Sequence, residues 1–103
     1  MNLAESRLSL QEVLSSICDH VYFQPGASIK LTYPAIIYRL GGIPEREADN
    51  ITYKTDHRYE VTLISKNPVD ERVDMLVNLP QCVMNSYFVT DNLHHWAFTV
   101  YHY

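Results

Sequence analysis

The chain has 103 residues, a formal net charge of −4, and 47% apolar against 19% charged residues. This length predicts one domain over residues 1–103, and this balance excludes an intrinsically disordered chain. The eight Lys and Arg residues form no run, which argues against nucleic-acid binding through phosphate contacts, and no apolar stretch reaches membrane-spanning length.

The first segment has the pattern of an amphipathic helix. Ser9 and Glu12 resemble a capping box, although Ala4, Glu5 and Leu8 allow an earlier start. One apolar stripe at helical period is formed by Leu10, Val13, Leu14, Ile17, Cys18 and Val21. A short strand is possible at residues 21–23, before Gln24-Pro25-Gly26 ends the ordered run.

Two strands are expected next, at residues 35–40 and 51–64. The first is rich in β-formers and lies between Pro34 and Gly41. The second alternates strictly, which predicts one face on a core and the other in water or against a polar partner. Its apolar face is Tyr53, Thr55, His57, Tyr59, Val61 and Leu63, and its polar face is Lys54, Asp56, Arg58, Glu60 and Thr62.

The connection between these strands, residues 41–50, is long and rich in charge and in helix and strand breakers. Such a length exceeds that of an ordinary hairpin loop. We interpret it as an arm that projects from the body of the domain. The alternative is a solvent loop without a role, since most loops of this kind carry none.

A second helix is expected after Ser65. Asn67 suits an N-cap, Pro68 suits the first helical position, and acidic Asp70 and Glu71 suit the first turn. Leu79-Pro80 ends this helix. Its expected buried face is Val69, Val73, Leu76 and Val77.

The remaining residues predict two strands, at 82–90 and 96–103, joined through the turn-forming pair Asp91-Asn92. The fold class is therefore α+β. We expect a mainly antiparallel sheet of four to five strands with two helices packed on one face.

The residues that could carry chemistry do not form a recognisable catalytic or metal-binding pattern. The five histidines lack metal-ligand spacing, although His57 and His102 could meet across paired strands. Cys18 and Cys82 are expected to be reduced thiols in a protein made in the cytosol, because the N-terminus lacks the apolar region of a signal peptide. The sequence predicts a protein that is not an enzyme and has no cofactor and no metal.

Several stretches carry a resemblance to a known family. They are residues 21–25, 30–38 and 59–64, then Asn67-Pro68 before an acidic helix, and residues 90–95 near the end. Together they resemble the tail-terminator proteins, also called tail-completion or head–tail joining proteins, of bacteriophages with long non-contractile tails. The resemblance covers nearly the whole chain, and its motifs are structural rather than catalytic.

The resemblance implies a structural virion protein, made in the host cytoplasm and located at the junction of tail and head. Members of the family form a hexameric ring on the head-proximal end of the tail tube. The ring ends tube polymerisation and presents a surface for the head-completion or connector protein. DNA passes through such a ring without sequence-specific binding, and no membrane is involved.

A ring requires one patch of each subunit to complement a different patch of the next. We hypothesise that the arm and the polar face of the 51–64 strand make the subunit and tube contacts, through Ile43, Glu45, Arg46, Glu47, Asp49, Lys54, Asp56, Arg58 and Glu60. The nearest alternatives are a head-completion or connector protein and a minor tail protein of the same junction. More distant ones are a small metal- or ligand-binding domain near His57 and His102, and a nucleic-acid binder.

Overall fold

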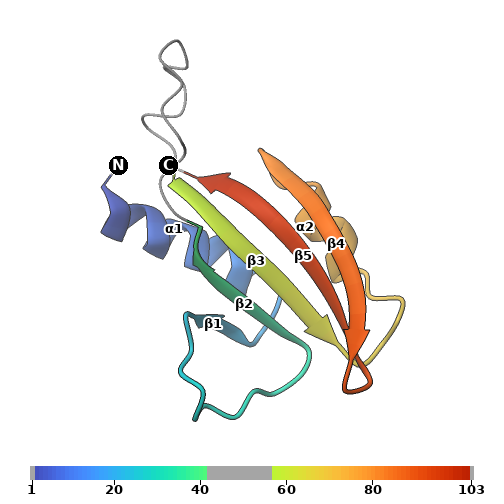
Figure 1. Ribbon diagram of the computed structural model, residues 1–103. Coiled ribbons are helices and arrows are strands. Elements are labelled where there is room, and N and C mark those ends of the chain that lie inside the picture. The colour runs from blue at the N-terminus through green and yellow to red at the C-terminus, as the bar shows by residue number, and fades with distance from the viewer. Residues whose placement is uncertain (1, 42–56, 103) are drawn as a thin grey trace.

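A computed structural model describes residues 2–41 and 57–102 of the chain. Within these ranges lie two helices and five strands (Figure 1). In chain order they are α1 (Leu3–Ser15), β1 (Val21–Phe23), β2 (Ala35–Leu40), β3 (His57–Ser65), α2 (Arg72–Val77), β4 (Cys82–Thr90) and β5 (Leu93–His102).

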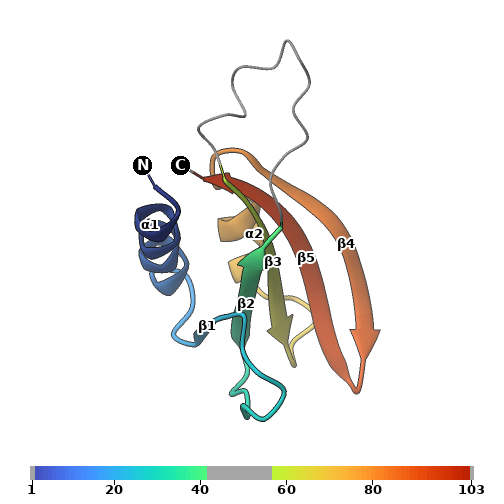
Figure 2. The same ribbon diagram turned by 60° about the vertical axis from the view of Figure 1, so that its left-hand side comes forward.

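The strands form one twisted sheet in the order β1-β2-β3-β5-β4 (Figure 2). β1 pairs with β2 in parallel, and the other three pairings are antiparallel. The predicted α+β class and mainly antiparallel sheet are therefore confirmed. The bounds expected for the strands at 35–40 and 82–90 are those observed, and the short strand at 21–23 exists.

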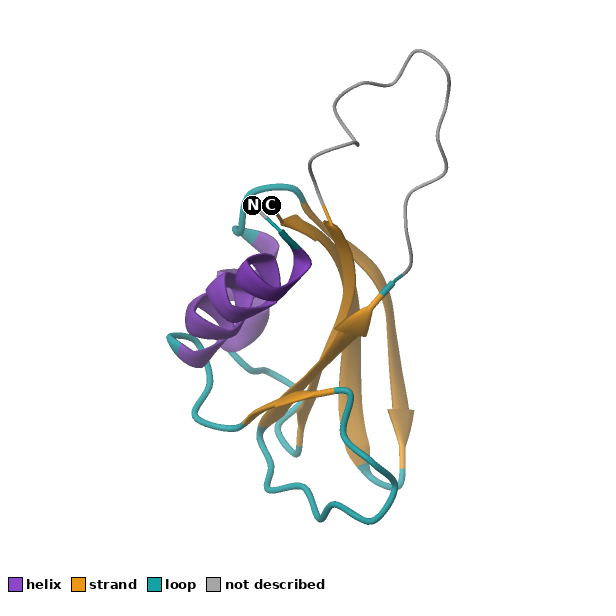
Figure 3. Cartoon of the chain, turned by 90° about the vertical axis from the view of Figure 1, so that its left-hand side faces the viewer, coloured by secondary structure: helices purple, strands orange, loops and turns teal. Residues whose placement is uncertain are grey.

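The core lies on one face of this sheet. The alternation of β3 buries Tyr59, Val61 and Leu63, each 0% exposed. The register places Val61 beside Tyr38 of β2 and Phe98 of β5. Figure 3 shows both helices on the same side of the sheet, and the buried cluster includes side chains from both of them, Leu10, Leu14 and Leu76. The opposite face carries no helix from the described part of the chain.

Helix α1 does not begin at the capping box that was predicted at Ser9. The helix begins at Leu3, and the side chain of its N-cap Asn2 accepts a hydrogen bond of 2.9 Å from the Glu5 backbone N–H. The earlier of the two starts considered is thus the observed one. The helix also ends at Ser15, so the last part of the expected stripe, including buried Cys18, lies beyond it.

Helix α2 is shorter than expected and begins at Arg72. The Asn67 side chain accepts from the Val69 backbone N–H at 3.0 Å, and Asp70 accepts from that of Arg72 at 3.0 Å. Such bonds to the residue two positions on stabilise turns, so the chain turns here before it enters the helix. As a result, Val69 is 82% exposed and the predicted buried face is wrong at that position and at half-exposed Val77.

A tight hairpin joins β4 and β5. Asp91 and Asn92 have φ values of 53° and 62°, the left-handed pair that a two-residue hairpin turn requires. The turn is this short because Thr90 pairs directly with Leu93. β5 therefore begins three residues before the expected Trp96, and His94 and His95 belong to the strand.

Candidate interaction surfaces

The arm and the first part of the polar strand face lie outside the described residues. This applies to seven of the predicted contact residues: Ile43, Glu45, Arg46, Glu47, Asp49, Lys54 and Asp56. The structure describes the other two, Arg58 and Glu60. Both lie on the face of β3 opposite the core, as the alternation predicted.

Glu60 is accessible on the outer face of β3. It is paired in register with Arg39 of β2 and with Thr99 of β5. Its carboxylate forms an ion pair with the Arg39 guanidinium, and the two side chains are 40% and 68% exposed. A pair this exposed adds little to folding stability, so both charges remain available to a partner.

Arg58 instead contributes to the local structure. Its guanidinium donates to the Gly41 carbonyl, and the Gly41 N–H donates to the Arg58 carbonyl at 2.8 Å. A Cβ at position 41 would lie 2.9 Å from the Arg58 Nε atom and 3.3 Å from the Arg58 carbonyl oxygen, so a larger residue there would require the Arg58 side chain to move. Arg58 thus fixes the end of β2 against β3.

The middle of this sheet face forms a shallow hollow of about 390 Å³. Small side chains form its floor, because Thr62 stands beside Ala97, which stands beside Ser86. The ion pair of Arg39 with Glu60 lies on its border. We call this region the open-face hollow; its lining also includes Ile37, Tyr38, Asn85 and Phe98.

Strand β4 forms a second surface, which the sequence analysis did not anticipate. It lies at the end of the strand order and contains no charged residue. Eight of its nine residues are exposed, including five large apolar side chains: Val83, Met84, Tyr87, Phe88 and Val89. The available signal was its two groups of consecutive apolar residues, 82–84 and 87–89, but consecutive apolar residues are typical of a strand buried on both faces.

Aromatic contacts join β4 to β5 on both faces of the hairpin. The Tyr87 ring stacks on His94 with centroids 5.9 Å apart, and the Tyr87 hydroxyl is 2.6 Å from the His94 Nδ1 atom. Phe88 stacks on His95 at 4.7 Å. The two adjacent histidines therefore point to opposite faces, as expected for a strand, and each is engaged by an aromatic ring.

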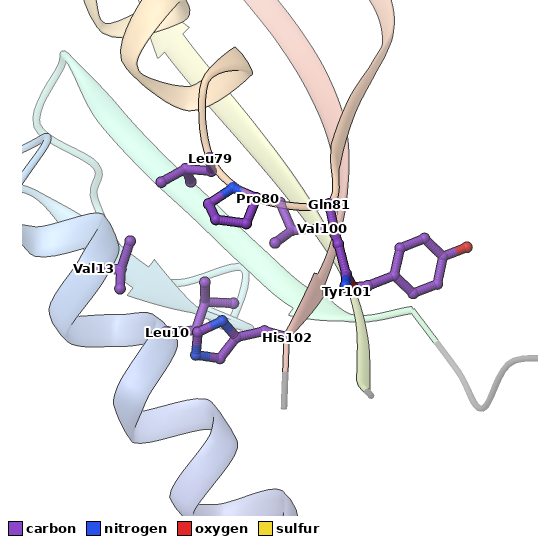
Figure 4. A pocket seen from close by; sticks show the side chains of 8 residues that line it. All are labelled: Leu10, Val13, Leu79, Pro80, Gln81, Val100, Tyr101 and His102. Carbon is purple, nitrogen blue, oxygen red and sulfur yellow. The ribbon is translucent and has the colours of Figure 1, made fainter. Parts of the chain in front are cut away.

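A smaller apolar cavity of about 220 Å³ lies between α1 and the end of β5 (Figure 4). Leu10 and Val13 line it from α1, Leu79 and Pro80 from the connection between α2 and β4, and Val100 from β5. Figure 4 shows the ring of Tyr101 extending away from the helix. The cavity belongs to the seam between helix and sheet.

His57 and His102 stand opposite one another in register, so the structure confirms that these two residues meet. The His102 Nε2 atom is 3.0 Å from the Ser9 hydroxyl oxygen. Among the described residues, no group of three or more His, Cys, Asp or Glu side chains is arranged to hold a metal ion.

Burial affects two groups that could otherwise react. Removal from water raises the pKa of the Cys82 thiol, which favours the unreactive protonated form. It also raises the pKa of Tyr38, and the lowering effect of Arg7 is smaller. The Tyr38 hydroxyl donates to the Gln11 side chain, so it serves to hold α1 on the sheet.

Comparison with protein families, with curated proteins and with solved structures finds no match to this chain. Neither α1 nor α2, the helices of the described residues, has the length and apolar character needed to cross a membrane.

Proposed function

We propose that this protein is a structural virion component that forms a hexameric ring on the head-proximal end of a phage tail tube. The ring ends tube polymerisation and offers the surface to which the head-completion or connector protein binds. The proposal rests on the family resemblance of residues 21–25, 30–38, 59–64 and 90–95, together with the surfaces described above.

One observation carries the proposal furthest. β3 separates a buried apolar face from an outer face on which Glu60, Arg39 and the open-face hollow remain accessible. A sheet face of this kind, with a charged border and a floor of small side chains, fits a protein contact better than it fits a small ligand. Enclosed, largely apolar pockets are typical of small-ligand sites.

The test is complementation of the parent phage after the gene is interrupted. Electron micrographs of the lysates should show overlong tails of variable length beside unattached filled heads, and the wild-type gene should restore normal particles. Normal-length tails that fail to join heads would place the protein on the head side of the junction. Intact infectious particles without the gene would refute the structural role.

A pair of variants then tests the open-face hollow. Thr62→Arg fills the hollow, and we expect it to fold but to fail in complementation. Thr32→Arg is the matched control, because Thr32 is an exposed residue in the loop between β1 and β2. Full rescue by Thr62→Arg would show that the ring and tube contacts lie elsewhere.

A further inference from the structure

The outer edge of β4 offers backbone groups for pairing. β4 lies at one end of the strand order, and no strand of the described residues pairs with its outer side. Thr90 and Leu93 flank the two-residue turn, so the backbone groups of Thr90 and Phe88 face β5. Those of Tyr87 and Val89 therefore face outward.

The apolar side chains of β4 project on both faces of the sheet. Tyr87 stands beside the core residue Trp96 and Val89 beside His94, while Phe88 stands beside His95 on the opposite face. Tyr87, Phe88 and Val89 are 48%, 47% and 52% exposed. A partner resting on one face would leave the other in water. A strand added to the edge covers both faces, because its own side chains alternate.

Length and charge identify the strand that fits. The opposite edge of the sheet is β1, which has three residues, whereas the regularly paired stretch of β4 after its register shift has five, Ser86–Thr90. A chain with net charge −4 repels its own copy at most surfaces, but β4 carries no charge. We propose that β4 pairs antiparallel with β4 of a second copy of this chain, across a two-fold axis.

The area is sufficient for such a dimer. Half-exposed aromatic side chains leave roughly 100 Å² each in water, and Tyr87 and Phe88 are two of five apolar side chains at this level. The patch on each copy is therefore about 300–600 Å². Complete burial of the patch on both copies would give a total of about 600–1,200 Å², a range that includes the roughly 1,000 Å² of the smallest specific interfaces. We expect a dimer that associates at micromolar concentration.

This inference goes beyond the proposed ring. A two-fold contact uses the same patch on both subunits and does not by itself close a ring. The dimer is the state of the free subunit, and it stands whether or not the protein terminates a tail.

The experiment is sedimentation velocity of the full chain, from about 1 to 100 µM, the range expected for an interface of this size. Wild-type protein should shift from 12.0 kDa toward twice that mass. Val89→Lys places a charge on the edge and should weaken dimerisation at least about tenfold. Val69→Lys makes the same substitution at an exposed position outside the sheet and should leave dimerisation unchanged.

Hydrogen exchange locates the contact. The amides of Tyr87 and Val89 should be protected in the dimer and exchange rapidly on dilution, whereas those of β3 should stay protected at all concentrations. A wild-type chain that remains monomeric throughout, or a dimer that Val89→Lys does not weaken, overturns the proposal. Equal circular dichroism of the two lysine variants, and equal thermal midpoints at a concentration too low for dimerisation, show that both are folded.

The same lysine variants separate this proposal from the proposed function. If Val89→Lys is monomeric in solution and still complements the phage, the dimer is real and the ring does not depend on it. If interruption of the gene leaves infectious particles while wild-type protein dimerises through β4, the tail role fails and the β4 contact remains.

Discussion

Strands β3 and β4 have the same length, nine residues, and opposite surroundings. β3 carries two charged residues, Arg58 and Glu60, and still contributes three fully buried side chains to the core. β4 carries no charge and has large apolar side chains in water on both faces. The number of apolar residues in a strand therefore does not predict how deeply the strand is buried in this fold. The alternation of polar and apolar residues in β3 does predict which of its side chains are buried.

The difference arises from the strand order. β3 lies between β2 and β5, so its backbone is paired on both sides and one of its faces packs on the core. β4 follows β5 at the end of the sheet. Natural edge strands are usually protected by charge, by proline, by a bulge or by a covering segment. The register of β4 shifts between Met84 and Ser86, but residues 86–90 pair regularly with β5 and carry no charge. The uncharged edge of β4 is thus a surface to which a further strand could pair.

The largest expected effect on the free energy of unfolding is the difference between two Phe→Ala substitutions, one in β5 and one in β4. Phe98 of β5 is 1% exposed and packs beside Val61, whereas Phe88 of β4 is 47% exposed. Phe98→Ala should cost about 3–5 kcal/mol of the free energy of unfolding, because it removes core contacts and leaves a cavity. Phe88→Ala should cost less than about 1 kcal/mol.

Urea denaturation at a protein concentration too low for dimerisation measures both values. Equal costs for Phe98→Ala and Phe88→Ala would remove the distinction between the two regions. A large cost for Phe88→Ala that appears only at high protein concentration would instead measure the dimer.

A smaller difference in stability is expected between the removal of a buried tyrosine hydroxyl and the removal of an exposed one. The Tyr59 hydroxyl donates to the buried Ser6 hydroxyl at 3.0 Å, and the Tyr87 hydroxyl lies 2.6 Å from His94 at the surface. Tyr59→Phe should cost about 1–2 kcal/mol, because a buried hydrogen bond is lost without replacement by water. Tyr87→Phe should cost less than about 0.5 kcal/mol. Thermal midpoints of the two variants provide the comparison.

Local signals were enough to predict most strand bounds and the class of the fold. Pro34 and Gly41 flank β2, and Asp91-Asn92 ends β4, because these residues favour turns over strands. The start of α2 was not predictable in this way. An Asn67 side chain that accepts a nearby backbone N–H stabilises a helix start and an isolated turn equally well.

The contact surfaces were only partly predictable, for a different reason. Alternation placed Glu60 on the outer face, but the bond of Arg58 to Gly41 depends on the register between two strands. The exposure of β4 depends on its position in the strand order, which is set by pairings far apart in the sequence. The hypothesis on residues 43–56 lies outside the described residues and stays a prediction.

The turn before α2 offers a pH-dependent test of a region held by polar bonds rather than by burial. Burial alone would raise the pKa of Asp70, but hydrogen bonds from the Arg72 backbone, the Ser65 hydroxyl and the Arg72 guanidinium together lower it below 3.8. A lowered pKa stabilises the folded state above the unfolded pKa, and this contribution is lost as the pH falls through the folded pKa.

The free-energy difference between wild type and Asp70→Asn should therefore be constant from about pH 7 to pH 5 and shrink below pH 3.8. A difference for Asp70→Asn that grows toward low pH would contradict the assigned bonds.

The smallest expected effect concerns the outer face of β3 itself. Glu60→Gln removes the ion pair with Arg39 but keeps the shape of the side chain. Because both side chains are more than a third exposed, the change should cost about 0–1 kcal/mol. Arg39→Gln should cost a similar amount, and the double variant should cost no more than the two together. If instead Glu60→Gln costs as much as Tyr59→Phe, the outer face of β3 contributes to folding as its inner face does. Glu60 and Arg39 would then be engaged within the domain, and the open-face hollow would lose the charged border on which its role as a contact surface depends.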